Sequence, residues 1–155
     1  MTSSTIGQRQ KDALATLDFN ATCWWFIEPT RTDADVHAVH SFYVEEMWLP
    51  VIGPTCTAML RQLSLVVEAR GSSFLSLEEL AHSIGLANGH GRSSAFARSI
   101  ARLVGFELAE VLGPTRLAVK TTVPWLTPSQ IARLQPGLQM RHGHYVKTHP
   151  AIYPY

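Results

Sequence analysis

The clearest pattern of apolar and polar positions lies in the middle of the chain. Apolar side chains recur at helical spacing between a start signal at Gly53-Pro54-Thr55 and a stop at Gly71. The same spacing returns further on, with Phe96 and Ile100 on one face. We therefore predict a helix over residues 54–70 and another that opens at residues 92–94 and runs to about residue 104.

A shorter helix is predicted between these two. Ser76, with Glu79 three residues later, is a capping box, so a helix begins at Leu77. Gly85 stands where a helix commonly ends in a left-handed residue. The polar, glycine-containing stretch 86–91 predicts a flexible loop.

After Gly105 the apolar period changes from helical to alternating. Phe106 and Leu108 alternate with less apolar neighbours, Gly113-Pro114 forms a tip, and alternation resumes over residues 116–121. This pattern predicts a β-hairpin with a short turn.

The last helix is predicted from its cap. Thr127 and Gln130 form another capping box, with proline at the first helical position, so the helix covers residues 128–135. Pro136-Gly137 is expected to break it. The tail over residues 147–155 is expected to be mobile unless it docks.

The N-terminal third carries weaker signals. Ser4 or Thr5 is expected to cap a short helix that runs through Asp18. Residues 23–27 (CWWFI) predict a strand or an anchor segment, residues 30–35 a loop, and residues 42–44 a second short extended stretch.

Composition places the chain among soluble globular proteins. Of its 155 residues, 46% are hydrophobic and 16% are charged, which excludes wholesale disorder, collagen-like sequence and a charged coiled coil. There is no apolar run long enough for a membrane helix and no apolar signal-peptide core, so we expect a cytoplasmic protein. Cys23 and Cys56 are expected to be free, buried thiols.

Charge is divided unevenly along the chain. Residues 1–79 carry five basic and ten acidic side chains, whereas residues 80–155 carry eight basic and two acidic ones. No carboxylate side chain follows Glu110. A basic half attracts a polyanion, although a solvated basic face is the alternative interpretation.

Residues 54–122 resemble a winged helix-turn-helix domain in their order of helix, short capped helix, amphipathic helix and hairpin. Residues 77–86 (LEELAHSIGL) look like the first half of a helix-turn-helix unit, and residues 94–104 stand in the recognition-helix position. Residues 49–55 (LPVIGPT) and 91–94 (GRSS) are also similar to a group of small uncharacterised actinobacterial winged-helix proteins. The stretch from Gly85 to Gly91 is longer than the usual helix-turn-helix turn, which leaves the docking angle of the third helix open.

The predicted third helix presents cations opposite its apolar face. On a helical wheel Arg98 and Arg102 stack one turn apart there, flanked by Ala95 and Ala101, which keep the surface low. A winged helix implies that such a helix enters the major groove of DNA, where arginine bonds guanine or phosphate. The candidate DNA-binding residues are therefore Arg92, Ser93, Ser94, Arg98, Arg102, Arg116 and Lys120, with Arg133 and Arg141 as an extension.

Other classes of function have less support in the sequence. The histidines at 142, 144 and 149 have no cysteine or carboxylate nearby, so neither a metal site nor a cofactor is expected. No catalytic motif is present, so we do not expect an enzyme. A winged helix that binds proteins without DNA is the alternative. The aromatic N-terminal third would support it, although these side chains could equally complete the core or a homodimer interface.

We therefore expect a mostly α protein with a small β-hairpin (α+β). It would have an N-terminal arm and aromatic anchor over residues 1–48, a winged-helix domain with a C-terminal helix over 49–146, and a tail over 147–155. The expected function is non-catalytic binding of double-stranded DNA in transcription regulation or DNA replication and maintenance. Such a protein would be nucleoid-associated, with a homodimer as one of its expected forms. Arg98→Ala is predicted to change sequence preference, and Lys120→Ala to weaken all sequences alike.

Overall fold

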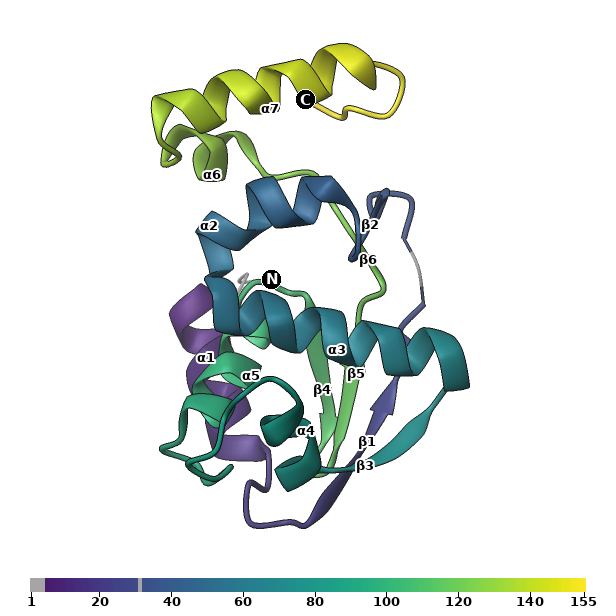
Figure 1. Cartoon of the computed structure of the whole chain (residues 1–155), viewed down its shortest axis with the longest axis vertical. Coiled ribbons are helices and arrows are strands. Elements are labelled where there is room, and N and C mark those ends of the chain that lie inside the picture. Colours follow the sequence, from purple (N-terminus) through teal and green to yellow (C-terminus); the bar gives the residue numbers. More distant parts are fainter. Residues whose placement is uncertain (1–4, 31) are drawn as a thin grey trace.

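A four-stranded sheet organises the lower half of the molecule as drawn in Figure 1, with the strand order β3-β1-β5-β4. The computed structural model describes residues 5–30 and 32–155. Strand β1 (Cys23–Ile27) lies antiparallel to β3 (Ser73–Ser76) and parallel to β5 (Arg116–Val119), and β4 (Ala109–Gly113) forms an antiparallel hairpin with β5. The N-terminal aromatic segment is thus an internal strand of the sheet.

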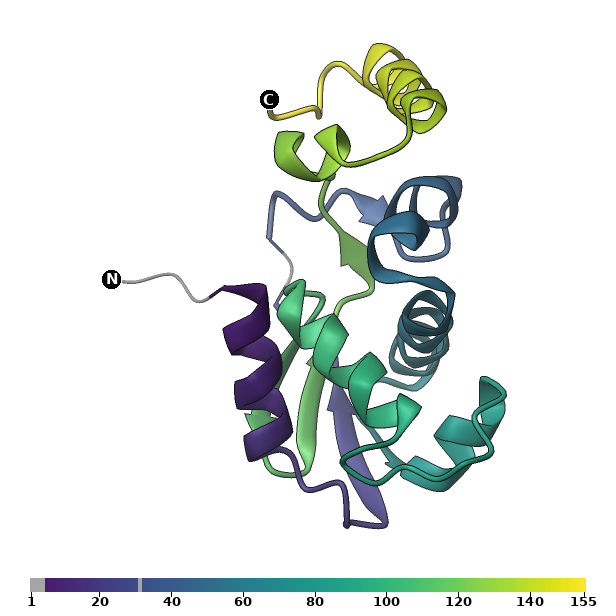
Figure 2. The same ribbon diagram turned by 90° about the vertical axis from the view of Figure 1, so that its left-hand side faces the viewer.

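Helices α3 (Pro54–Arg70) and α5 (Ala95–Gly105) cover the inner face of this sheet, and together they bury the core. Trp24, Phe26 and Leu117 point inward and are fully buried, and the Trp24 ring lies 6.3 Å from the ring of Phe96 on α5. Helix α4 (Leu77–Ser83) follows β3 directly, and α1 (Ile6–Thr16) lies beside α5 (Figure 2). Alternation along β1 explains this burial, because every second side chain faces the helices.

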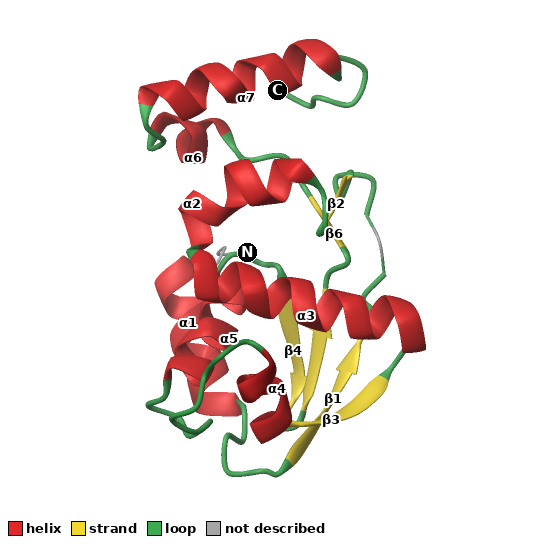
Figure 3. Ribbon diagram, in the orientation of Figure 1, coloured by secondary structure: helices red, strands yellow, loops and turns green. Residues whose placement is uncertain are grey.

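The remaining elements form the upper half of the view in Figure 3. They are the two-stranded sheet of β2 (His37–Ala38) and β6 (Thr122–Val123), the π-helix η1 (Val44–Trp48), and helices α2 (Leu49–Ile52), α6 (Pro128–Ala132) and α7 (Pro136–Thr148). The hydroxyl oxygen of Tyr43 ties them together, since it accepts the Leu126 N–H at 2.8 Å and lies 2.8 Å from Nε2 of His142 on α7.

The predicted helix starts are confirmed at their caps. Backbone N–H groups donate to the side chains of Thr5, Ser76, Ser94 and Thr127, and the full capping box forms at Thr127 and Gln130. The alternative first cap, Ser4, lies outside the described residues. Gly53 and Gly71 flank α3, and Gly85 is left-handed with φ of 81°.

The fold is mixed α and β, and it contains more sheet than the predicted hairpin; residues 23–27, predicted as a strand or an anchor segment, form strand β1. The parallel pairing of β1 with β5 and the short strands β2 and β6 were missed. The prediction of a strand from Phe106 is wrong, because Phe106 caps α5 and the strand begins at Ala109.

Two further predictions are wrong, each for a different reason. Residues 42–44 are helical rather than extended, because the continuing π-helix buries Val44 and Met47 on one face. Pro136 begins α7 instead of ending a helix, since proline at the first helical position loses no hydrogen bond.

The tail docks on the protein instead of remaining free. The indole N–H of Trp125 donates to the Ile152 carbonyl at 3.1 Å, and the ring of Tyr153 lies 5.1 Å from that of Trp125. Both cysteines are free; Cys56 is buried and Cys23 is half-buried. No helix in the described part of the chain is long and apolar enough to cross a bilayer.

Candidate functional site

The outward face of α5 is a narrow strip between two other helices. On one flank the buried Cys56 of α3 contacts the Ser99 carbonyl through its thiol, at 3.6 Å. On the other flank α1 covers the helix, so that Ala101 is only 3% exposed. Arg98 and Arg102 remain exposed between these flanks, as predicted.

Gly105 allows α1 to approach α5 so closely. A Cβ at this position would lie 2.8 Å from Cγ of Gln10, closer than real Cβ contacts, and 3.0 Å from Cγ2 of Ile6, which is tighter than most. Nε of Arg9 also donates to the Gly105 carbonyl at 2.9 Å. The prediction that Ala101 forms a low open surface beside the arginines is therefore wrong, because α1 occupies that space.

The residues at the N-terminal end of α5 lie together. The Ser94 hydroxyl accepts the Ala97 N–H at 3.1 Å, so capping already engages this side chain. Nη1 of Arg98 donates to the Ser93 carbonyl at 2.8 Å, which holds the loop against the helix. Arg92 is exposed in the same loop. Five of the seven predicted site residues thus lie on α5 or in the three residues before it.

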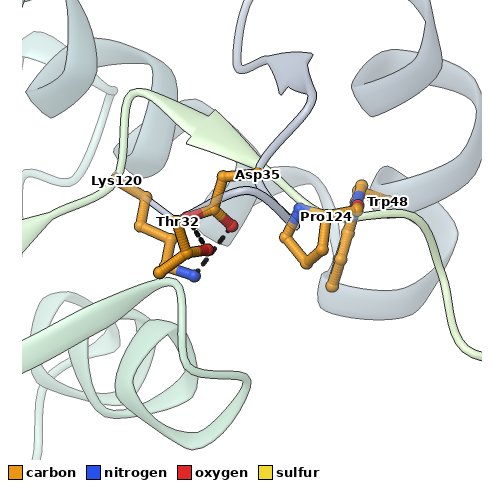
Figure 4. A network of polar contacts seen from close by, with 5 residues as sticks. All are labelled: Thr32, Asp35, Trp48, Lys120 and Pro124. Atoms are coloured by element: carbon orange, nitrogen blue, oxygen red, sulfur yellow. Dashed lines mark hydrogen bonds and ion pairs between the residues drawn. The ribbon is translucent and has the colours of Figure 1, made fainter. Parts of the chain in front are cut away.

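Lys120 does not belong to this edge. Its Nζ lies 3.0 Å from Oδ1 of Asp35, whose side chain is only 3% exposed, and the Thr32 hydroxyl donates to the other oxygen of the same carboxylate at 3.0 Å. Figure 4 shows the three side chains converging, with Trp48 beside Pro124 nearby. Lys120 therefore neutralises a buried carboxylate, and its charge is not free for a phosphate.

Arg116 lies on the other face of the sheet. In the strand register it is level with Trp25, which is level with Phe74, and the rings of these two aromatics stack with centroids 5.1 Å apart. Trp25 is 44% exposed and Phe74 is 58% exposed. The sheet thus separates Arg116 from the arginines of α5, and the predicted pairing of a basic hairpin with this helix does not form.

The two cations of the predicted extension differ. Arg141 forms an ion pair with Glu46 at 3.1 Å, whereas Arg133 is exposed at the end of α6. Within the described residues, no ion pair involves Arg92, Arg98, Arg102 or Arg133. These four guanidinium groups are therefore available to an anionic partner.

A buried group of aromatic and histidine side chains was missed by the sequence analysis. His37 is 8% exposed and stacks on Tyr43 with ring centroids 3.9 Å apart, and Nε2 of His37 has no hydrogen-bond partner. Burial, reinforced by His149 and His142, lowers the pKa of His37 to about 4. Burial also lowers the pKa of His142. The alternation of His37 with Val39 was the available signal, but a lone histidine gives no hint of its partners.

The described residues contain no group of three or more His, Cys, Asp or Glu side chains that could hold a metal ion. Comparisons with other proteins add no assignment. No protein-family model matches the chain, and no curated protein or solved structure matches it either.

Proposed function

We propose that this protein binds double-stranded DNA through the exposed edge of α5, in a fold of the winged-helix type. The element order α3, β3, α4, α5, β4 and β5 supports the fold proposal, since it repeats the helix, strand, helix, helix and hairpin order of that superfamily. One departure is the insertion of β1 between β3 and β5. Transcription regulation and DNA maintenance are the processes that such an activity would serve.

The observation that carries the proposal is the row of unpaired arginines. Arg98 and Arg102 lie one turn apart on α5, and Arg92 lies in the loop before the helix; all three are exposed, and none forms an ion pair within the described residues. Guanidinium groups bind phosphate oxygens with two parallel hydrogen bonds, and phosphate contacts supply most of the sequence-independent affinity for DNA.

The flanks of α5 determine the kind of contact we propose. Because α1 and α3 leave only a narrow strip exposed, long side chains reach the duplex more readily than the helix itself enters a groove. We therefore assign Arg98 and Arg102 to the sugar–phosphate backbone first. Reading of bases by Arg98 remains a separate prediction, which Arg98→Ala tests across a set of duplex sequences.

The decisive experiment measures fluorescence anisotropy of labelled duplex DNA at several salt concentrations. Three phosphate contacts predict that the logarithm of the binding constant falls with the logarithm of salt with a slope of about −2.7 per protomer. The double variant Arg98→Glu/Arg102→Glu is expected to lose at least tenfold in affinity.

Arg70→Glu/Arg116→Glu is the matched control, because it changes net charge equally at exposed positions away from this edge. Its affinity for the duplex is expected to stay within about threefold of that of the parent, because the change in net charge is then the only cause of weaker binding. Equal losses in both double variants, or no binding at low salt, would refute the proposed interface.

A second candidate function rests on the outer face of the sheet. The exposed pair of Trp25 and Phe74 lies at the β3 edge of the sheet, and exposed aromatic pairs are typical of protein interfaces. This candidate is protein binding without DNA, and a second copy of the chain is its simplest form. Light scattering distinguishes it, since Trp25→Ser/Phe74→Ser would then convert a dimer into a monomer.

A further inference from the structure

A hollow of about 610 Å³ lies where α1, α2, the end of α5 and α6 meet. Figure 2 shows α6 above the upper ends of α1 and α5. This volume falls within the range of small-molecule sites. Of the seven predicted site residues Arg102 lines it, together with Arg133 of the predicted extension, and the rest of its lining comes from residues outside that prediction.

The lining combines an apolar wall with unpaired cations. Ile6, Val51, Phe106 and Leu134 supply apolar surface from four different segments. Arg102 and Arg133 line the same hollow, and neither forms an ion pair within the described residues. A lining that combines apolar side chains with two arginines matches a ligand with an apolar body and an anionic group.

The other polar groups of the lining leave these two arginines uncompensated. Glu107 also lines the hollow, but its carboxylate lies 3.7 Å from Nη1 of Arg9, so this pair largely cancels. At the entrance to α6, the Gln130 side-chain oxygen accepts the Thr127 N–H at 2.9 Å, and the Thr127 hydroxyl accepts the Gln130 N–H at 3.3 Å. These capping groups bond to each other and do not compete for the cations.

We propose that this hollow binds a small amphiphilic organic acid, with its anionic group held by Arg102 and Arg133 and its apolar part against Phe106 and Leu134. The site also reaches the α5 edge, because Arg102 lines two further hollows, one at the start of α3 and one against α1. A ligand that neutralises Arg102 therefore weakens binding of DNA to that edge, and by linkage DNA weakens the ligand. This second statement rests on the proposed function, whereas the pocket itself does not.

The test uses the full chain and a fluorescent probe of this chemistry, 8-anilinonaphthalene-1-sulfonate. N-phenyl-1-naphthylamine has the same rings without the sulfonate and is the neutral control. We expect saturable binding of one sulfonate probe per chain. Arg133→Ala, at an exposed position, is expected to weaken that binding about tenfold and to leave the neutral probe unchanged. Arg70→Ala is the control variant and is expected to bind both probes as the parent does.

Equal affinity of the sulfonate probe for the parent and Arg133→Ala would overturn the pocket, because binding would then be to apolar surface elsewhere. A separate anisotropy arm adds saturating sulfonate probe to the duplex titration. Weaker DNA binding in the parent, but not in Arg133→Ala, supports the coupling. If neither the parent nor Arg133→Ala binds the duplex, with or without the probe, the proposed function is refuted. The pocket is then judged by the probe titrations alone.

Discussion

The phenol oxygen of Tyr43 lies 2.8 Å from Nε2 of His142, which follows 99 residues later in the chain. The Leu126 N–H donates to the same oxygen, and burial lowers the pKa of His142, which favours its neutral ring. We therefore assign the Tyr43 proton to the bond with Nε2 of His142, which accepts it. The hydroxyl of Tyr43, the residue directly before η1, therefore bonds both to the segment before α6 and to helix α7. This arrangement requires that His142 carry no charge.

Acid is expected to destabilise the fold through these histidines. The pKa of His37 falls from 6.5 to about 4 on folding and that of His142 is also lowered, so the unfolded chain binds more protons in this range. The neutral histidines contribute fully to the free energy of unfolding above about pH 6.5, and this contribution is lost as the pH falls toward 4. Urea unfolding at pH 7 and pH 4.5 is expected to differ by about 2 kcal/mol. His37→Phe, which keeps the stack on Tyr43, should reduce this difference; an unchanged difference would exclude His37 as a cause.

Lys120→Ala is expected to cost stability and to spare DNA affinity. Removal of the ammonium group leaves the buried Asp35 carboxylate without its cation, at a cost of about 2–3 kcal/mol in urea unfolding. Lys120→Ala/Asp35→Ala should recover part of that loss, because no unpaired charge remains. A loss of duplex affinity in Lys120→Ala with unchanged stability would return Lys120 to the DNA interface.

Gly105→Ala is expected to loosen α1. Alanine normally favours a helix, but here its Cβ meets Gln10 and Ile6 of α1, so we expect a net loss of about 1–3 kcal/mol. Hydrogen exchange should show faster exchange in α1 than in α3. Adding Gln10→Ala removes the closest contact and should restore part of the stability; no restoration would place the strain elsewhere.

Glu107→Gly is expected to stabilise the protein by about 1 kcal/mol. Glu107 has a φ of 60°, in the left-handed region that glycine occupies without strain, and its side chain is 72% exposed. Its contact with Arg9 at 3.7 Å is an exposed ion pair of little value. Glu107→Ala retains the strained backbone and should show no such gain in urea unfolding. Equal effects of the two substitutions would contradict the backbone explanation.

Local signals predicted the helix starts well, because a cap acts within four residues. Ser76, Ser94 and Thr127 each accept the expected backbone N–H. Pairings between segments far apart in the chain could not be predicted from the sequence. Parallel pairing of β1 with β5 joins Trp25 to Arg116, and neither segment specifies the other by its own pattern.

In the candidate site, too, local signals were readable from the sequence and distant partners were not. The outward position of Arg98 and Arg102 follows from helical periodicity alone. The loss of Lys120 from the site depends on Asp35, and the narrowing of the exposed strip depends on Gly105 and α1. Charge and periodicity therefore identify candidate cations, but tertiary partners decide which of them remain available.

The place of β1 inside the sheet also constrains the order in which the protein can fold during synthesis. Among the described strands β1 is translated first, whereas its two neighbours in the sheet begin at residues 73 and 116. Until the second of these has emerged, the apolar side chains of Trp24 and Phe26 have no complete sheet to enter. The nascent chain must therefore keep this aromatic segment from premature association until the residues of β5 have been translated.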